Sequence, residues 1–402
     1  MPRAKGATMT LPLEGYKVLD ISRVLAGPYC CSLLGEVGAE VIKIERPGLG
    51  DENRRWGALW NGESLDYLSV NRNKRSLTVD IKRPEGQEII RRIAAQADVL
   101  VENFSGPVLD GLGLGYEQLS AINPRLVYCS ISAYGAKGPM KDKPGYDGAV
   151  QAFSGHMSMT GEPDGGPVRT GASVVDLGTG ITAYGAVMTA LMQRTRTGKG
   201  QKVTVSLLQT ALALMAQHAA SFLMHGEEPK RAGAGVSHLA PYGAFRTQDS
   251  WVVTGALNEA SWQKLCGLLG CEALVDDPRF ADGALRVKHR AALDEYFHAA
   301  FGKKTSAEWT VIFEEAGVVI APVNTLRESL NHPQVLANDM VVSVQHATAG
   351  EVKLTGAPMS FSSWDIGPRR APPALAQHTG EILDEYGYTA EQIAAFREQK
   401  VV

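Results

Sequence analysis

The chain has 402 residues, more than a single hydrophobic core usually serves, so two domains are expected. Its 44% hydrophobic and 21% charged residues are typical of a globular protein. A formal net charge of −3 gives no reason to expect nucleic acid or an anionic membrane as a partner. No stretch approaches the ~20 consecutive apolar residues of a membrane helix. The five cysteines contain no C-x-x-C pair and are odd in number, which indicates reduced thiols and a cytoplasmic location.

The first ten residues, MPRAKGATMT, are basic and lack the apolar core of a secretory signal, so a loose tail is expected there. An apolar strand over 18–21, a helix over 28–37 and a strand over 40–45 then form a βαβ unit that ends on an acidic residue. This arrangement looks like the start of a dinucleotide-binding fold, but the first turn lacks G-x-G-x-x-G. A nicotinamide site is therefore disfavoured.

Basic residues gather in the run Asn71-Arg-Asn-Lys-Arg75, just before a predicted strand over 76–81. Such residues beside a strand end can hold phosphates or carboxylates, although a solvated surface loop is the commoner role of a charge run. Helices over 84–97 and 116–122 alternate with buried strands over 98–104 and 126–132. This alternation predicts an α/β domain with ligands at the carboxyl ends of its strands.

The pattern changes after about residue 220. A predicted hairpin over 241–246 and 251–257 is followed by three helical stretches and a strand over 318–323. We therefore expect a large α/β domain over 10–224, a smaller α+β domain over 225–325, and a return to the large domain over 326–402. A second hairpin is expected over 340–354, and a capping box at Thr389 and Gln392 opens a last helix.

Asp176 stands alone among small and apolar residues at the start of a helical pattern that runs to about residue 196. We expect it in the first turn, with Ser173 three residues before it as a weak capping signal, and ionised at neutral pH by the positive end of the helix. Gly178 and Gly180 would let another molecule approach the carboxylate. The alternative is an acid that only supports the helix end. The nine histidines show no metal-ligand spacing and there is no G-x-S-x-G elbow, so no metal is expected.

Several blocks together carry a resemblance to a known family. Five blocks are similar, in this order, to blocks of the class III CoA-transferases: VLDISRVLAGPYCCSLLGEVGAEVIKIERPGLGD, SVNRNKRSLTVDIK, ADVLVENFSGPVLDGLGLGYEQL, NPRLVYCSISAYGAKGP and TGKGQKVTVSLL. The resemblance covers about residues 11–390. It implies a Rossmann-like α/β large domain with an inserted smaller α+β domain, and an interlocked homodimer. It also implies CoA as a substrate and no tightly bound cofactor.

The family's nucleophile is an Asp before a Gly- or Thr-rich helix, and Asp176 in VVDLGTG holds that place. The resemblance implies that this carboxylate attacks an acyl-CoA to give an aspartyl anhydride, which CoA then converts to an aspartyl-CoA thioester. The acceptor acid would then react with this thioester and run the same steps backwards. It also places a set of residues at the CoA, with the first loop near the reacting sulfur: Leu25, Ala26, Arg46, Val79, Lys82, Asn103, Phe104 and Tyr146.

RPGLGDENRRWG, PVRTG and SHLAPYGAF look like the branch that uses succinyl-CoA and dicarboxylates. A second carboxylate needs a cation, and Arg72 and Arg169 are the candidates, each with a structural salt bridge as its alternative. No unbroken Gly run occurs over 225–265, which argues against formyl-CoA and oxalate. A related racemase would need His where Tyr146 stands. A third alternative is a CoA-binding protein without catalytic activity, in which Asp176 would have no chemical role.

Overall fold

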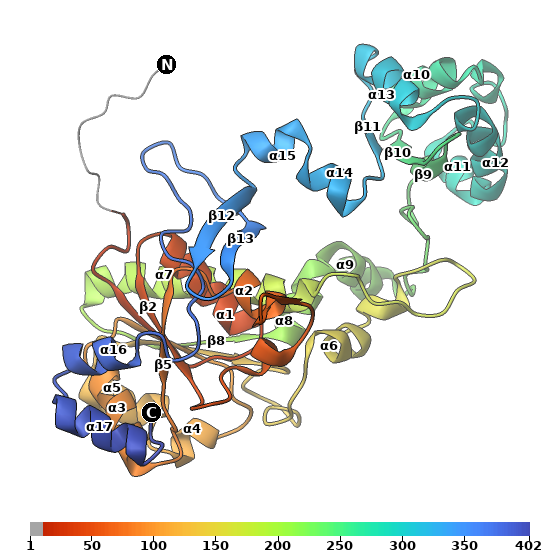
Figure 1. Ribbon diagram of the computed structural model, residues 1–402. Helices are drawn as coiled ribbons and strands as arrows, with labels where there is room; N and C mark the ends of the chain where they lie inside the picture. Colours follow the sequence, from red (N-terminus) through yellow and green to blue (C-terminus); the bar gives the residue numbers. More distant parts are fainter. Residues whose placement is uncertain (1–10) are drawn as a thin grey trace. The chain divides into compact units, whose positions relative to one another are not determined.

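The computed structural model describes residues 11–402 and divides them into two compact units (Figure 1). The predicted tail over 1–10 lies outside the described residues. The first unit comprises residues 11–150, 172–214 and 333–402, and the second comprises 151–171 and 215–332. The predicted domain boundaries at 225 and 325 are therefore shifted, and residues 151–171 belong to the second unit. One reason is a backbone bond, since the N–H of Gly233 donates to the carbonyl of Gly161 at 3.0 Å.

A six-stranded sheet forms the centre of the first unit, with strand order β5-β2-β1-β6-β7-β8 and only parallel pairs. Its order reverses between β1 and β6, as in Rossmann folds, so the predicted α/β class is confirmed. The strands are β1 (Lys17–Asp20), β2 (Glu40–Glu45), β5 (Lys74–Thr78), β6 (Val99–Glu102), β7 (Val127–Ser132) and β8 (Lys202–Ser206).

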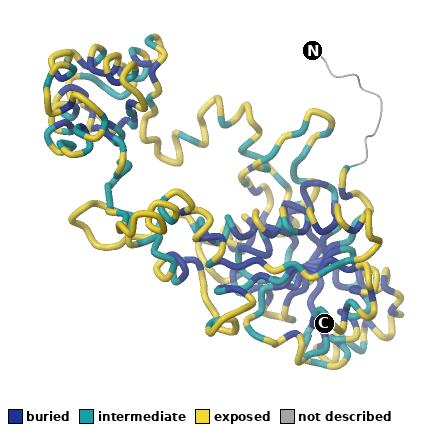
Figure 2. Tube along the Cα trace, turned by 180° about the vertical axis from the view of Figure 1, so that it is seen from behind, coloured by how far each residue is buried: buried dark blue, intermediate teal, exposed yellow. Residues whose placement is uncertain are grey.

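Helices cover both faces of this sheet because successive strand residues point to opposite sides. Val18 packs in the core on one face and Leu19 in the core on the other. The first face carries α1 (Ala26–Glu36), α7 (Val174–Thr197) and α8 (Leu207–Leu214). The second carries α3 (Pro84–Ala94), α5 (Tyr116–Ile122), α16 (Thr379–Glu385) and α17 (Ala390–Glu398). Figure 2 shows the sheet as the most deeply buried part of this unit.

Shorter elements complete the first unit. The expected second hairpin is present as β12 (Val341–His346) with β13 (Gly350–Thr355), and the capping box of Thr389 and Gln392 opens α17 as expected. The others are η1 (Glu52–Arg55), β3 (Leu59–Trp60), β4 (Glu63–Ser64), α2 (Leu65–Ser69), α4 (Val108–Gly111) and α15 (Pro333–Ala337), while α6 (Asp147–Phe153) spans the division between the units.

The second unit is an α+β module with an aromatic core that includes Phe245, Trp262 and Phe297. Its antiparallel sheet has the order β11-β10-β9, in which β9 (Tyr242–Arg246) and β10 (Trp251–Gly255) form the predicted hairpin. The remaining elements are β11 (Ile320–Pro322), η2 (His156–Ser158), η3 (Glu272–Leu274), α9 (Ala216–His225), α10 (Glu259–Leu269), α11 (Gly283–Lys288), α12 (Arg290–Phe301), α13 (Ser306–Glu315) and α14 (Leu326–Leu330).

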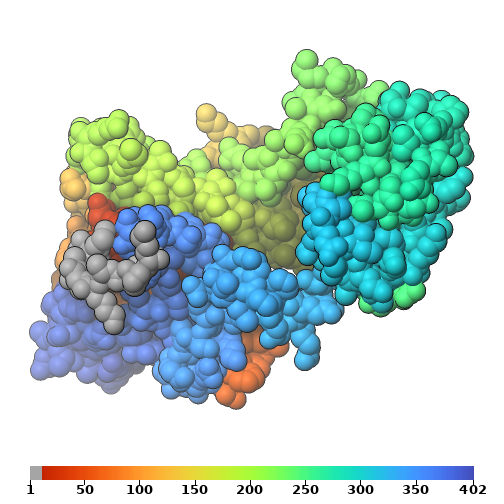
Figure 3. Space-filling model, turned by 90° about the horizontal axis from the view of Figure 1, so that it is seen from above, coloured from red at the N-terminus to blue at the C-terminus, as the bar shows by residue number. Residues whose placement is uncertain are grey.

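Helix α7 has 24 residues and is long and apolar enough to cross a membrane, as are α8 and α9 together across a 76° bend. The expectation that no stretch comes near this length was therefore wrong. In the fold, α7 packs on α1 and the sheet, and its Arg194 donates to Asp98 at 2.8 Å. Its outward side reaches the surface (yellow-green in Figure 3), where Ile181 is 50% exposed and Met192 63% exposed. Core helices of globular proteins share this composition.

Candidate active site

The residues that the sequence assigned to CoA follow the carboxyl ends of four parallel strands. Leu25 and Ala26 follow β1, Arg46 follows β2, Val79 and Lys82 follow β5, and Asn103 and Phe104 follow β6. Because all four strands run in the same direction, these residues lie at one edge of the sheet. The strand order reverses between β1 and β6, so the first loop and Asn103 lie at the reversal point, where sheets of this kind bind ligands.

These residues differ in what they expose. Arg46 and Lys82 are exposed at the edge, whereas the side chain of Val79 is buried in the core. The half-buried ring of Phe104 lies under the guanidinium of Arg23, with 4.6 Å between the Arg23 Cζ and the ring centroid. The amide of Asn103 bonds both backbone groups of Arg23, accepting from its N–H at 2.9 Å and donating to its carbonyl at 2.7 Å. Asn103 thus fixes the first loop.

Asp176 lies in the first turn of α7, as predicted, and is partly buried. The capping group differs from the expected one, because the Ser173 side chain makes no cap bond. The carboxylate of Asp147, at the start of α6, accepts from the N–H of Val175 at 2.9 Å and from that of Asp176 at 3.1 Å. Asp147 was not among the expected site residues, because its 29-residue separation from Asp176 leaves no local signal of this contact in the sequence.

Burial raises the pKa of Asp176 to about 7, and the negative charge of Asp147 adds to the rise. Asp176 was expected to be ionised at neutral pH, whereas this pKa leaves it only partly ionised there. The positive end of α7 does not favour Asp176 as expected, because the Asp147 carboxylate already occupies it. A carboxyl group with this pKa is about half ionised near pH 7.

The two glycines after Asp176 serve helix packing. A Cβ on Gly180 would lie 2.7 Å from the carbonyl oxygen of Ala26 on α1, and one on Gly178 would lie 3.2 Å from a Thr210 methyl on α8. The expectation that they leave room for another molecule is corrected, since protein atoms fill that space. The missing side chains instead let α7 approach α1 closely.

Helices α1 and α7 run in the same direction, which places Asp176 beside the first loop. Helix α1 begins after the carboxyl end of β1, and α7 ends where Arg194 meets Asp98 at the amino end of β6. Gly180 contacts Ala26, the first residue of α1. Asp176 is four residues earlier, and about 6 Å of helical rise carries it past the start of α1 toward the loop over 23–25.

The two arginine candidates occupy different surroundings. Arg72 is 2% exposed, forms an ion pair with Glu36 and donates to the carbonyl of Thr355. Because Glu36 ends α1 and Asp176 lies near its beginning, about 15 Å of helix separates Arg72 from the carboxylate. This placement agrees with the salt-bridge alternative for Arg72. Arg169, in the second unit, is exposed and donates to the carbonyl of Gly171 at 3.4 Å. Tyr146 is 73% exposed.

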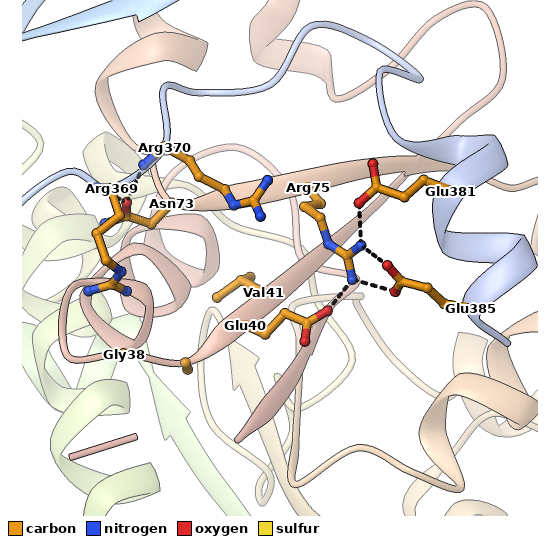
Figure 4. A pocket seen from close by; sticks show the side chains of 10 residues that line it. Gly38, Glu40, Val41, Asn73, Arg75, Arg369, Arg370, Glu381 and Glu385 are labelled. Atoms are coloured by element: carbon orange, nitrogen blue, oxygen red, sulfur yellow. Dashed lines mark hydrogen bonds and ion pairs between the residues drawn. The ribbon is translucent and has the colours of Figure 1, made fainter. Parts of the chain in front are cut away.

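A cavity of about 390 Å³ lies at the opposite, amino edge of the sheet (Figure 4). Its wall includes Arg75, which pairs with Glu381 at 2.7 Å and with Glu385 at 2.6 Å and also contacts Glu40. Arg369 donates to the carbonyl of Glu36 at 3.0 Å. The cations of the 71–75 run are buried and paired rather than part of a solvated loop, since Arg75 pairs here, Arg72 pairs with Glu36, and Lys74 lies 2.9 Å from Asp20. The cavity is remote from Asp176. Within residues 11–402, no group of three or more His, Cys, Asp or Glu side chains could hold a metal ion.

Comparison with known proteins gives consistent matches over most of the chain. The model of CoA-transferase family III matches residues 13–379. The succinyl-CoA:glutarate CoA-transferase of Mus musculus is 43% identical over 375 residues, covering 93% of this chain and 86% of that protein. The succinate–glutarate CoA-transferase of Agrobacterium fabrum is 36% identical, with 93% and 95% covered. The crystal structure of a CAIB/BAIF family protein from Brucella suis superposes with a TM-score of 0.84 at 35% identity, covering 94% of this chain and 100% of that one.

Proposed function

This chain belongs to CoA-transferase family III, and we propose that it moves CoA from succinyl-CoA to a dicarboxylic acid through a covalent intermediate on Asp176. The observation that carries the proposal is the placement of Asp176. Its partly buried carboxylate has a pKa of about 7 and lies beside the loop at the reversal point of the sheet. The names of the mouse and Agrobacterium relatives support succinyl-CoA as donor and glutarate or a similar diacid as acceptor.

The proposed reaction begins when an ionised Asp176 oxygen attacks the thioester carbonyl of succinyl-CoA. The C–S bond breaks, which leaves an aspartyl–succinyl anhydride and CoA thiolate. The thiolate then attacks the Asp176 carbonyl, releasing succinate and forming an aspartyl-CoA thioester. The acceptor carboxylate attacks that thioester, and the returning thiolate takes the acceptor's acyl group. Each step exchanges one acyl bond for another, so no proton is consumed overall and Asp176 is restored.

The raised pKa of Asp176 suits this role because a more basic carboxylate is a better nucleophile while remaining partly ionised at neutral pH. Helix α7 offers little to a developing oxyanion, since the N–H groups of Val175 and Asp176 are bonded to Asp147. Within the described residues, the N–H groups of Leu25, Ala26 and Gly27 have no protein acceptor. We propose that the first loop, Leu25 and Ala26 foremost, faces the reacting thioester.

The rest of the CoA would extend along the carboxyl edge of the sheet. Arg46 and Lys82 are the exposed cations there for its phosphates, and Phe104 supplies an aromatic surface. We propose backbone contact for Val79, whose side chain is buried, and an indirect role for Asn103 through Arg23. Exposed Tyr146 precedes Asp147 and is proposed to contact the acyl-CoA. No tightly bound cofactor is required.

For the distal carboxylate of the acceptor we propose Arg169. It is exposed, lies seven residues before Asp176 in the chain, and belongs to the PVRTG block. Arg72 is set aside because its guanidinium pairs with Glu36 in the core. The racemase alternative is not favoured, since the block that would need a histidine base carries Tyr146 and the relatives are CoA-transferases.

We further propose a homodimer in the cytoplasm. Exposed apolar side chains on α7 and α8, among them Met192 at 63% and Leu214 at 54%, are a surface that a second subunit would cover. All five cysteines are free, which supports a reducing compartment. Light scattering of the purified protein tests the dimer, and a monomer at micromolar concentration would contradict it.

The covalent mechanism is tested by incubating the protein with succinyl-CoA alone and recording its intact mass. Wild type should gain CoA less one water on a peptide containing Asp176, and D176N should gain nothing. Glutarate added afterwards should discharge the adduct as glutaryl-CoA. Carboxylate-¹⁸O glutarate gives a second test, because the mechanism leaves one of its oxygens in Asp176 and delivers that oxygen to succinate in the next turnover. Full activity of D176N would refute the assignment.

A further inference from the structure

Val24 has an unusual backbone conformation in the first loop of the sheet. Its φ is +69°, in the left-handed region that favours glycine and that β-branched side chains avoid. The neighbouring Leu25 has φ −132° and ψ −61° and ends the loop at the start of α1. A strained conformation of this kind persists only where the surroundings impose it, and such residues cluster at functional sites.

Three side chains hold the backbone of this loop. The carboxylate of Asp51 accepts from the N–H of Val24 at 3.0 and 3.2 Å. The amide of Asn53 donates to the Val24 carbonyl at 2.7 Å. Asn103 bonds both backbone groups of Arg23 from the end of β6. The N–H and carbonyl groups of Arg23 and Val24 are therefore all bonded by side chains from the segments that follow β2 and β6.

Buried charges hold Asp51, one of these three side chains, in place. The Lys43 ammonium lies 3.0 Å from an Asp51 oxygen and donates to the carbonyl of Ser22 at 2.9 Å. Both residues are almost fully buried, as is Asn53 at 2% exposure. Asp51 also accepts from the N–H of Asn53 at 3.3 Å, which orders the short helix that carries Asn53. Lys43 thus bonds the backbone at the start of the loop, at Ser22, and Asn53 bonds it at Val24.

From this geometry we propose that Asn53 is a positioning residue, which with Asp51 holds Val24 in the left-handed conformation and so fixes Leu25 and Ala26 against Asp176. The inference rests on the proposed function, because it assigns the loop to the reacting thioester. Gly180 contacts Ala26 at the start of α1, and Asp176 lies about one helical turn before Gly180 on α7, toward the loop. Asn53 contacts neither Asp176 nor, by this proposal, the substrate, and acts only through Val24.

The first variant to test is Asn53→Ala, with Asn123→Ala as its matched control. Asn123 is also buried and donates to two backbone carbonyls, those of Ala94 and Ala97, but it follows α5 at the amino edge of the sheet. Both variants should lose similar thermal stability. Asn53→Ala should lower kcat by about tenfold to a hundredfold with a smaller change in KM, because misplacement of a reacting group costs rate more than binding. Asn123→Ala should keep the wild-type kcat.

The decisive measurement is rescue by glycine. In the Asn53→Ala background, Val24→Gly should recover at least threefold in kcat, because glycine adopts a positive φ without the steric cost. A purely structural role of Asn53 predicts no such recovery. Unchanged kcat in a folded Asn53→Ala protein, equal losses in the two asparagine variants, or no rescue by Val24→Gly would each overturn the inference. A wild-type protein without transferase activity would overturn the proposed function as well, whereas an active wild type with an equally active Asn53→Ala variant overturns only this inference.

Discussion

The interaction between Asp147 and Asp176 predicts how activity depends on pH. Asp147→Asn keeps an acceptor oxygen for the two N–H groups of α7 but removes the negative charge. The pKa of Asp176 rises from 3.8 to about 7, and burial is the larger of the two causes. The charge of Asp147 therefore accounts for less than half of the rise, at most about 1.5 pH units or about 2 kcal/mol. Coulomb's law with an effective dielectric constant of ~20 gives this energy for two charges about 8 Å apart.

The assay is kcat/KM for succinyl-CoA between about pH 5 and 9, which reports ionisations of the free enzyme. Wild type should show an acid limb with a midpoint near 7, the pKa of Asp176. Asp147→Asn should move this limb to lower pH, by up to about 1.5 units, with a lower plateau because the nucleophile becomes less basic. Asp282→Asn is the control, since Asp282 caps α11 in the second unit through Leu285 at 2.8 Å. A limb that stays in place or moves to higher pH in Asp147→Asn would refute the reasoning.

Three further predictions concern stability and substrate choice. The folded state raises the pKa of Asp176, so ionising this group costs the fold nothing below about pH 4, progressively more up to pH 7, and a constant amount above. Asp176→Asn should thus stabilise the protein by up to about 4 kcal/mol at pH 8 and little at pH 4, and equal melting shifts at both pH values would contradict this. Arg169→Met should weaken the use of dicarboxylate acceptors by about 2 kcal/mol or more relative to monocarboxylates of equal length. Arg72→Met should instead destabilise the fold by about 3–5 kcal/mol and leave the preference for dicarboxylates unchanged. Steady-state kinetics measures the preference and melting curves measure the stability, so the two roles can be separated. Gly180→Ala should destabilise the folded protein by about 1–3 kcal/mol, because the new methyl group would contact Ala26. Gly185 has open space around it, so Gly185→Ala should be neutral or stabilise the protein by up to about 1 kcal/mol. Denaturant unfolding that ranks the two variants in the opposite order would refute the packing role of Gly180.

The sequence by itself determined the elements and their class. Alternation of period two and 3.6 located the strands of the sheet and helix α7, although β5 (Lys74–Thr78) begins two residues before the strand expected over 76–81 and so includes the end of the basic run. The capping pair Thr389 and Gln392 marked α17. It also placed Asp176 in a first helical turn, because that is a local property of a few consecutive side chains. The CoA residues came from the family resemblance instead, and only the structure places Val79 and Asn103 after the ends of β5 and β6.

Only the tertiary structure decided which groups surround Asp176. Its pKa depends on burial and on Asp147, which is 29 residues away in the chain. The sequence also contained no sign of the partner of Arg72, since Glu36 is 36 residues away in the chain. Nor did it show that the space beside Gly180 is filled by the backbone of Ala26. Charge interactions and close packing depend on distance in space, and the sheet order that sets those distances comes from the packing of the whole unit rather than from any local pattern.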